Sequence, residues 1–98
     1  MVIETSIGFY LQNLRKERKM SLREVAEHIG IDVSMLSKIE HGERQLQSHM
    51  IVPLADFFQI DYKTIQILFI NQKILQEYGN EPFFEDSLKR ILKNRKEV

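Results

Sequence analysis

The stretch SLREVAEHIGIDVSMLSKIEHGER, residues 21–44, carries the clearest structural pattern in the chain, because it predicts two short helices joined by a turn at Gly30. Ser21 and Glu24 have the spacing of a capping box, in which the serine oxygen accepts a first-turn N–H and the glutamate accepts the serine N–H. A helix should therefore begin at Leu22. Apolar side chains recur every three or four residues along it, and the glycine can adopt the left-handed conformation that ends it.

The second helix of the pair is predicted over residues 33–41, with Asp32 as its N-cap, and has two unlike sides. At about 100° per residue, the apolar side chains gather on one side: Met35, Leu36 and Ile39. The other side carries small or polar side chains with one lysine: Val33, Ser34, Ser37, Lys38 and His41. Small residues allow close approach, hydroxyls reach base edges or phosphates, and a lysine reaches a guanine edge, so this side suits the major groove of DNA.

These residues resemble the helix-turn-helix of the Cro and phage-repressor superfamily, with SLREVAEHIGI as its first helix and turn and DVSMLSKIEHGER as its recognition helix and the following glycine turn. The resemblance covers residues 7–65. It implies an all-α fold, a five-helix Cro/repressor-like helix-turn-helix domain, to which this chain adds a C-terminal helix. The small size is most similar to the controller proteins of restriction-modification systems, which regulate the endonuclease gene and their own.

The resemblance also implies roles for residues outside the recognition helix. In the family an arginine on the first helix pairs with the glutamate before the glycine turn, and these positions hold Arg15 and Glu40. Such a pair would fix the angle of the recognition helix, and a charge near the inward side of a helix needs a partner. By position, Ser21, Arg44 and Gln45 are the candidates for contact with the DNA backbone. A solvated loop is the competing interpretation for Gln45.

Composition bounds the class of protein. The 98 residues are 43% hydrophobic and 29% charged, as in an ordinary globular protein, so we expect one helix-turn-helix domain over residues 1–98. Its core is expected at 6–65, and a dimerisation helix and C-terminal extension at 61–98. The absence of cysteine excludes disulfides and thiolate metal sites and fits a cytoplasmic location. No stretch approaches the ~20 apolar residues of a membrane span, so no membrane partner is expected.

The charge balance argues mildly against nucleic-acid binding. Fourteen basic and fourteen acidic residues give a formal net charge of zero, whereas many nucleic-acid-binding domains are strongly basic. Local placement matters more than the total, and basic residues cluster at 14–19 and again at Lys38 and Arg44. We therefore expect moderate non-specific affinity, with base contacts and dimer geometry contributing more than charge.

Further helices are predicted on both sides of the motif. Residues 6–19 form an amphipathic helix, preceded by a frayed lead at 1–5. A fourth helix is expected over residues 49–58, or from about Ile51, because Pro53 fits only a first helical turn.

The helix predicted over residues 62–78, with Asp61 as its cap, is apolar on two opposite sides. One side is expected to face the core: Ile65, Leu68, Phe69 and Leu75. The other side consists of Ile67, Ile70, Ile74 and Tyr78. A small domain covers one side only, so either the C-terminal tail or a second subunit covers the other. We favour a homodimer interface there, since a twofold pair would place two recognition helices about 34 Å apart, one turn of B-DNA.

A last helix is predicted from about Pro82, and its side chains divide into two sides. The apolar side consists of Phe84, Leu88, Ile91 and Leu92, and the outer side is rich in lysine and arginine. We expect the apolar side to pack on the helix at 62–78 of the same chain or of the partner. The basic side is expected to be solvated rather than bound to phosphate.

Two functions from different classes remain, and catalysis is not one of them. The three histidines lack metal-type spacing, Ser37 and His41 have no third catalytic partner, and we expect no cofactor or metal. The first function is a homodimeric transcriptional regulator on an inverted-repeat DNA operator, controlling restriction-modification genes including its own, with RNA polymerase as a candidate partner. The second is an antitoxin or adaptor that binds a protein through the same scaffold. The exposed Ser34, Ser37 and Lys38 favour the first, because protein-binding surfaces usually display larger anchors.

Overall fold

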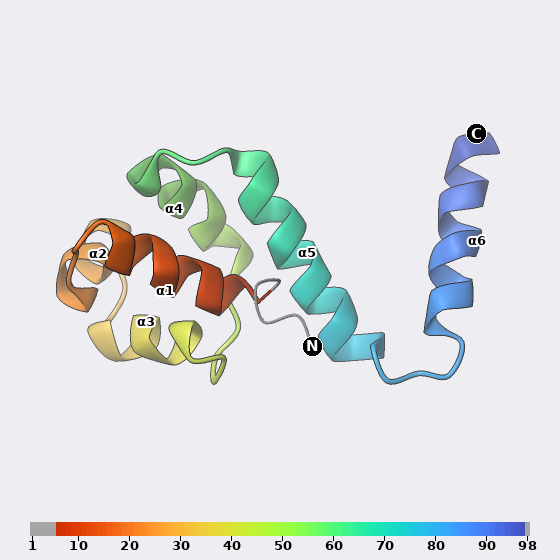
Figure 1. Cartoon of the computed structure of the whole chain (residues 1–98), viewed down its shortest axis with the longest axis horizontal. Helices are drawn as coiled ribbons and strands as arrows, with labels where there is room; N and C mark the ends of the chain where they lie inside the picture. The colour runs from red at the N-terminus through yellow and green to blue at the C-terminus, as the bar shows by residue number, and fades with distance from the viewer. Residues whose placement is uncertain (1–5, 98) are drawn as a thin grey trace.

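The computed structural model describes residues 6–97, which form six α-helices and no strand (Figure 1). The helices are α1 (Ile7–Glu17), α2 (Leu22–Ile29), α3 (Val33–Glu40), α4 (Ile51–Phe58), α5 (Tyr62–Tyr78) and α6 (Phe84–Glu97), with a 3₁₀ turn at Ser48–Met50. This confirms the predicted all-α fold, a five-helix domain followed by a C-terminal helix. The lead predicted at residues 1–5 lies outside the described residues. None of the described helices is long and apolar enough to cross a bilayer.

The two helices of the motif begin and end close to where the sequence predicts. The Ser21 Oγ accepts the Glu24 N–H at 3.0 Å, and the Glu24 carboxylate accepts the Ser21 N–H at 2.8 Å, which completes the capping box of α2. Gly30 ends α2 in the left-handed conformation, with φ 77°. Asp32 occupies the N-cap of α3, but its side chain accepts no capping hydrogen bond. Its predicted position is therefore right and its predicted capping contact is wrong.

The remaining helix ends also follow local signals. Ser6 caps α1, and Asp61 caps α5 by accepting a first-turn N–H. Helix α1 ends two residues before its predicted end at Lys19, which takes a left-handed conformation with φ 55°. Pro53 lies in the first turn of α4, where its missing N–H costs no helical hydrogen bond.

The hydrophobic core lies between α1, α2, α3, α4 and the first half of α5. Its fully buried members in the described residues are Ile7, Leu11, Val25, Ala26, Leu36, Ile39, Leu46, Met50, Ile51, Leu54, Ala55, Phe58 and Ile65. Helix α3 packs against α1 and α2, while α4 packs against α2 and α5. Helix α3 therefore lies along one edge of the domain, with its inner side held by two neighbours (Figure 1).

Helix α5 covers the core with one side and leaves the other open. Ile65 is buried, and Leu68 and Phe69 are partly buried against the core. Leu75, predicted to face the core, is 51% exposed, so that prediction is wrong. The reason is that Leu75 lines an open pocket with Gly8, Ile39 and Gln76, between α5 and the domain, instead of packing in the core. On the opposite side Ile67, Ile70 and Tyr78 are exposed and Ile74 is half-buried.

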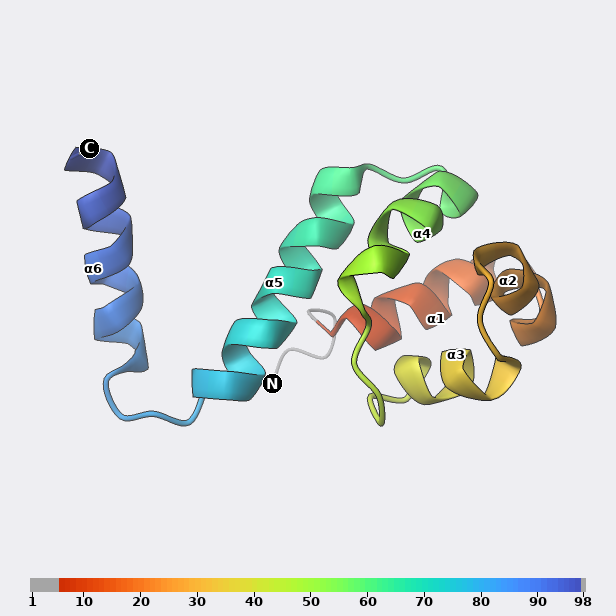
Figure 2. The ribbon, with the colours of Figure 1, turned by 180° about the vertical axis from the view of Figure 1, so that it is seen from behind.

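Helix α6 stands away from the rest of the molecule, as both views of the ribbon show (Figures 1 and 2). Residues 79–83 link it to α5, and a groove separates the two helices. The molecule measures 45 × 26 × 21 Å along its principal axes. The predicted packing of α6 along α5 of its own chain is therefore not present, because the linker leads the two helices apart.

Candidate nucleic-acid interface

Helix α3 presents the side predicted to read DNA at the surface of the domain. Three of the five predicted base-reading residues are exposed and two are half-buried: Ser34, Lys38 and His41 in the first group, Val33 and Ser37 in the second. Val33 packs partly against the core, which limits the reach of its side chain. Ser34 and Lys38 lie one helical turn apart and are both open. They form the centre of the accessible surface of α3.

His41 follows the last residue of α3 and is fixed by the helix itself. Its ring Nδ1 lies 2.7 Å from the Ser37 carbonyl oxygen, which accepts its proton. In the neutral ring Nε2 is then left as an acceptor at the end of α3. Residues 6–97 contain no group of three or more histidine, cysteine, aspartate or glutamate residues that could hold a metal ion.

An ion pair between Arg15 and Glu40 ties α1 to the end of α3. The Arg15 Nε donates to Glu40 Oε2 at 2.7 Å, and Nη2 donates to Oε1 at 3.0 Å. The third donor, Nη1, reaches the Met20 carbonyl at 2.9 Å, so the same guanidinium also holds the α1–α2 connection. The Glu40 side chain is only 1% exposed. Its hydrogen bonds and charge raise the pKa of Arg15 and outweigh the opposing effect of burial, so the guanidinium stays charged.

Gly8 allows α1 to approach the end of α3 more closely than any other residue would. A Cβ atom at this position would lie 2.2 Å from the Ile39 carbonyl oxygen and 3.0 Å from the Glu40 carbonyl oxygen. The backbones of the two helices therefore meet directly at Ile39 and Glu40. Sequence reasoning missed Gly8, because a glycine inside an amphipathic pattern has no side chain that indicates a packing partner.

The three predicted backbone contacts have different surroundings. The Ser21 hydroxyl accepts the capping hydrogen bond but keeps its own proton free to donate. Arg44 is exposed and follows a turn at Gly42, which has a left-handed φ of 78°. Gln45 is half-buried, and its side-chain amide donates to the Gln76 side chain on α5. Ser21 and Arg44 thus present hydrogen-bond donors at the surface, while Gln45 links the loop to α5.

Arg18, part of the basic cluster at 14–19, is engaged within the fold. Its guanidinium donates to the Phe58 carbonyl at the end of α4 and lies 5.3 Å from the centre of the Phe58 ring. Such contacts satisfy a carbonyl that the helix leaves unpaired and add a cation–π attraction. Arg18 is exposed but engaged in these contacts, and Lys16 and Lys19 are the other exposed cations of this cluster.

Comparisons with known proteins agree with this architecture. Residues 11–65 match a family described as helix-turn-helix. Among solved structures, the chain is similar to the crystal structure of the clp gene regulator ClgR from Corynebacterium glutamicum, with a TM-score of 0.58 and 22% sequence identity, covering 90% of this chain and 87% of that one. A comparison with curated proteins gave no match. At this identity the structural similarity supports the fold alone, whereas the family match spans more than half of the chain.

Proposed function

The chain belongs to the helix-turn-helix family, and we propose that it is a sequence-specific transcriptional regulator that binds an inverted-repeat operator as a homodimer. The observation that carries this proposal is the surface of α3. Its exposed side chains are Ser34, Lys38 and His41, with the half-buried Ser37 beside them, and such side chains can approach base edges closely and form hydrogen bonds there. Nothing in the packing of the domain requires such residues, since the buried side of α3 already holds it in place.

Rigid attachment of α3 supports the same function. A recognition helix discriminates bases only if its angle to the domain is fixed, because phosphate contacts position the domain and base contacts then read the sequence. The Arg15–Glu40 pair and the close contact at Gly8 both act at the end of α3. Ser21 and Arg44 are the proposed phosphate contacts, and Gln45 has a smaller role there because its amide is already bonded to Gln76.

The proposed homodimer uses the open side of α5. Ile67, Ile70, Ile74 and Tyr78 form a contiguous apolar side on one helix, and exposed apolar surface of this kind is typical of an interface. A twofold contact there would present two copies of α3 to one duplex, about 34 Å apart for adjacent major grooves.

We further propose that the regulated genes belong to a restriction-modification system and include the regulator's own gene, with RNA polymerase as a second partner. This narrower assignment rests on the single helix-turn-helix unit in the part of the chain that the structure describes. The alternative is an antitoxin or adaptor that uses the scaffold to bind protein, with DNA contact weak or absent.

Selection of bound duplexes from a random pool tests the proposal, because it returns the half-site, its spacing and its symmetry together. A palindromic site with half-sites one helical turn apart is expected. Affinity for the selected site should fall steeply with salt, with a linear log–log slope, because bound phosphates release counterions. Failure to select any duplex, or binding that ignores salt, would favour the adaptor.

Lys38→Ala should weaken binding to the selected site by about 1–3 kcal/mol and relax the preference at one base pair. Lys63→Ala is the matched control, because Lys63 is an exposed lysine at the start of α5, at the opposite end of the domain from α3 (Figure 1). Binding constants are measured on the selected duplex and on its single-base variants. Equal weakening on every sequence would make Lys38 a phosphate contact instead.

A further inference from the structure

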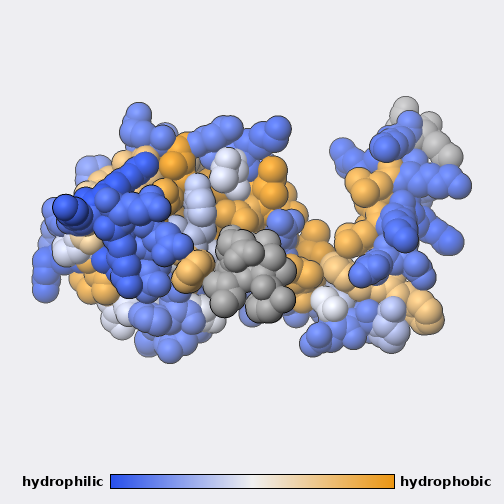
Figure 3. Space-filling view, in the orientation of Figure 1, coloured by the Kyte–Doolittle hydropathy of each residue, from blue (hydrophilic) through white to orange (hydrophobic). Residues whose placement is uncertain are grey.

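Exposed apolar side chains of this molecule concentrate at its C-terminal end. Among the residues that the structure describes, nine large hydrophobic residues are exposed, and seven of them lie between Ile67 and Leu92, on α5, the linker and α6. Phe83 in the linker is 74% exposed, and Leu92 on α6 is 61% exposed. The space-filling view shows apolar atoms along the side of α6 that faces α5 and hydrophilic atoms on its outer side (Figure 3). An arm of this composition is unfavourable in water unless something covers it.

The size of the molecule gives an independent measure of the uncovered surface. The chain exposes 7284 Å², whereas a compact monomer of its mass exposes about 5900 Å². The difference is about 1400 Å², larger than the ~800 Å² that one partner buries in a typical stable interface. The radius of gyration of 15.3 Å likewise exceeds the ~12.6 Å expected for a compact chain of this length.

A groove between the end of α5 and α6 has the lining that an apolar helix requires. It has a volume of about 400 Å³ and is lined from α5 by Ile74 and Tyr78 and from α6 by Phe84, Leu88 and Ile91. The apolar sides of both helices therefore turn toward the same space. A helix with the same kind of apolar side would fill that space and cover both of them.

We propose that α6 of a second copy of this chain occupies this groove, antiparallel to the α6 that lines it, so that two copies exchange their C-terminal helices. The proposal rests on the homodimer proposed above and specifies how its subunits are joined. In each copy α5 and α6 form the two walls of the groove and leave the space between them open. The apolar side of α6 matches the apolar lining of the partner's groove. The contact is thus self-complementary, as a twofold interface must be.

The charges of α6 favour the antiparallel arrangement. Its first turn carries Glu85 and Asp86, and its last turn carries Arg95 and Lys96. Antiparallel pairing places the acidic start of one helix beside the basic end of the other, whereas parallel pairing would place like charges together. Arg95 lies on the apolar side of α6 by helical position, and Glu81 lines the groove just before it. In the proposed antiparallel dimer Arg95 therefore lies beside the acidic start of the partner's α6.

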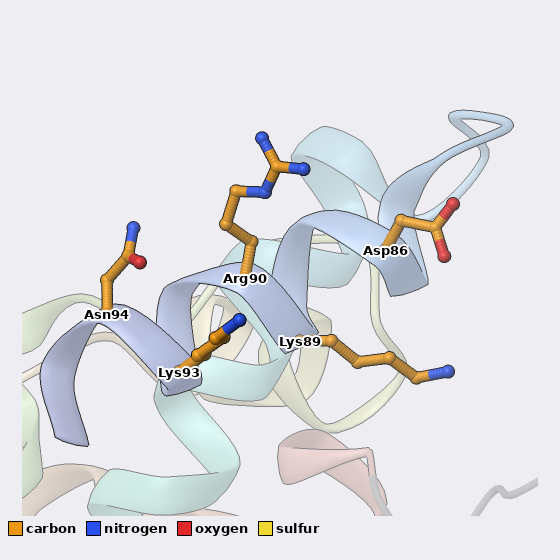
Figure 4. A pocket seen from close by; sticks show the side chains of 5 residues that line it. All are labelled: Asp86, Lys89, Arg90, Lys93 and Asn94. Carbon is orange, nitrogen blue, oxygen red and sulfur yellow. The ribbon is translucent and has the colours of Figure 1, made fainter. Parts of the chain in front are cut away.

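The opposite side of α6 stays in water in this arrangement. Asp86, Lys89, Arg90, Lys93 and Asn94 line an open hollow along that side, and their side chains spread away from the helix (Figure 4). Charged side chains at an interface centre are costly unless they are paired. The exchange therefore uses the apolar side alone. A cysteine on the hydrophilic side should not reach the partner and can serve as a control.

Disulfide trapping tests the exchange directly, because the chain contains no cysteine. A size-tagged Ile74→Cys protein is mixed with an untagged Leu88→Cys protein, dissociated, reassociated and oxidised. A covalent heterodimer is expected on a non-reducing gel, because a disulfide requires Cα atoms about 4.4–6.8 Å apart. Ile70→Cys in place of Ile74→Cys samples the neighbouring turn of α5. Lys89→Cys, on the hydrophilic side of α6, is the matched control and should give several-fold less heterodimer.

Two results would overturn the exchange. One is a heterodimer yield no higher with Leu88→Cys than with Lys89→Cys at both α5 positions. The other is an internal disulfide in the Ile74→Cys/Leu88→Cys double variant that runs as a monomer, since α6 would then fold back on its own chain. If either result is found with a protein that still binds its selected duplex, the proposed helix exchange is wrong, whereas the proposed function as a DNA-binding regulator is supported. Trapping in a protein that selects no duplex would support the exchange and overturn the regulator.

Discussion

At the scale of single residues, the buried ion pair between Arg15 and Glu40 shows how a contact distant in sequence positions the surface of α3. Its two partners come from α1 and from the last turn of α3, and the guanidinium also holds the Met20 carbonyl between them. A carboxylate that is 1% exposed depends on this partner, because burial removes the water that would otherwise stabilise its charge.

Arg15→Met should lower the free energy of unfolding by about 3–5 kcal/mol, because it leaves the buried Glu40 carboxylate without a counter-charge. Urea denaturation followed by circular dichroism measures the change. Arg23→Met, at an exposed arginine on α2, is the control and should change stability by less than about 0.5 kcal/mol. The Arg15→Met/Glu40→Leu double variant should recover part of the loss, since it removes the unpaired charge as well. Equal losses in the single variant and the control would contradict this account.

Gly8→Ala should destabilise the domain by about 1–3 kcal/mol, because the added methyl group meets the backbone oxygen of Ile39 at 2.2 Å and overpacks the α1–α3 contact. On helix propensity alone the same change would be stabilising by about 1 kcal/mol. The sign of the measured change in unfolding free energy therefore shows which of the two effects is larger. Thermal and urea unfolding of Gly8→Ala are compared with those of Asn13→Ala, at an exposed position of α1. A stabilised Gly8→Ala protein would show that the two helices separate without cost.

At the scale of helices, the N-caps of α2 and α3 look alike in sequence and differ in structure. Ser21 completes a reciprocal capping box with Glu24, whereas Asp32 makes no capping hydrogen bond. Both residues occupy N-cap positions with extended backbone. The side-chain hydrogen bond therefore separates an effective cap from a residue that only occupies the position.

Ser21→Ala should cost about 1 kcal/mol of folding stability, because it leaves the Glu24 N–H in the first turn of α2 without its side-chain acceptor. Asp32→Ala should cost less, since no capping hydrogen bond is lost. Denaturant titrations of the two variants under the same conditions give the comparison. A larger loss for Asp32→Ala would mean that its carboxylate stabilises α3 through the helix dipole rather than through a hydrogen bond.

At the scale of the whole molecule, its elongated shape and its open apolar sides point to assembly. The helix-turn-helix core buries its own apolar residues, while α5 and α6 leave theirs uncovered. A dimer that covers these surfaces would also fix the spacing between its two copies of α3. The proposed DNA binding therefore depends on dimerisation.

Ile70→Asp should raise the dimer dissociation constant by about a hundredfold or more, because association would bury an unpaired carboxylate. Helical content should be nearly unchanged, since Ile70 is 45% exposed in the single chain. Sedimentation velocity reports the assembly state, and circular dichroism reports the helices. Thr64→Asp, at an exposed position in the first turn of α5, is the control. An unchanged sedimentation coefficient for Ile70→Asp would remove this side of α5 from the interface.

Local patterns were sufficient to predict most of the architecture. The capping box at Ser21, the glycine at position 30 and the apolar periodicity place the motif helices to within a residue, because each of these signals acts over a single helical turn. The two apolar sides of α5 were also visible, since helical geometry alone assigns its residues to sides.

Contacts between helices were beyond such patterns, because they depend on how the helices pack in three dimensions. The approach of Gly8 to Ile39, the contact of Arg18 with the end of α4 and the link from Gln45 to Gln76 join positions 31 to 40 residues apart. Leu75 fits the periodicity of the buried side and is nevertheless exposed, because it lines an open pocket between α5 and the domain instead of packing in the core. The separation of α6 follows from the path of its linker, which helical periodicity does not determine.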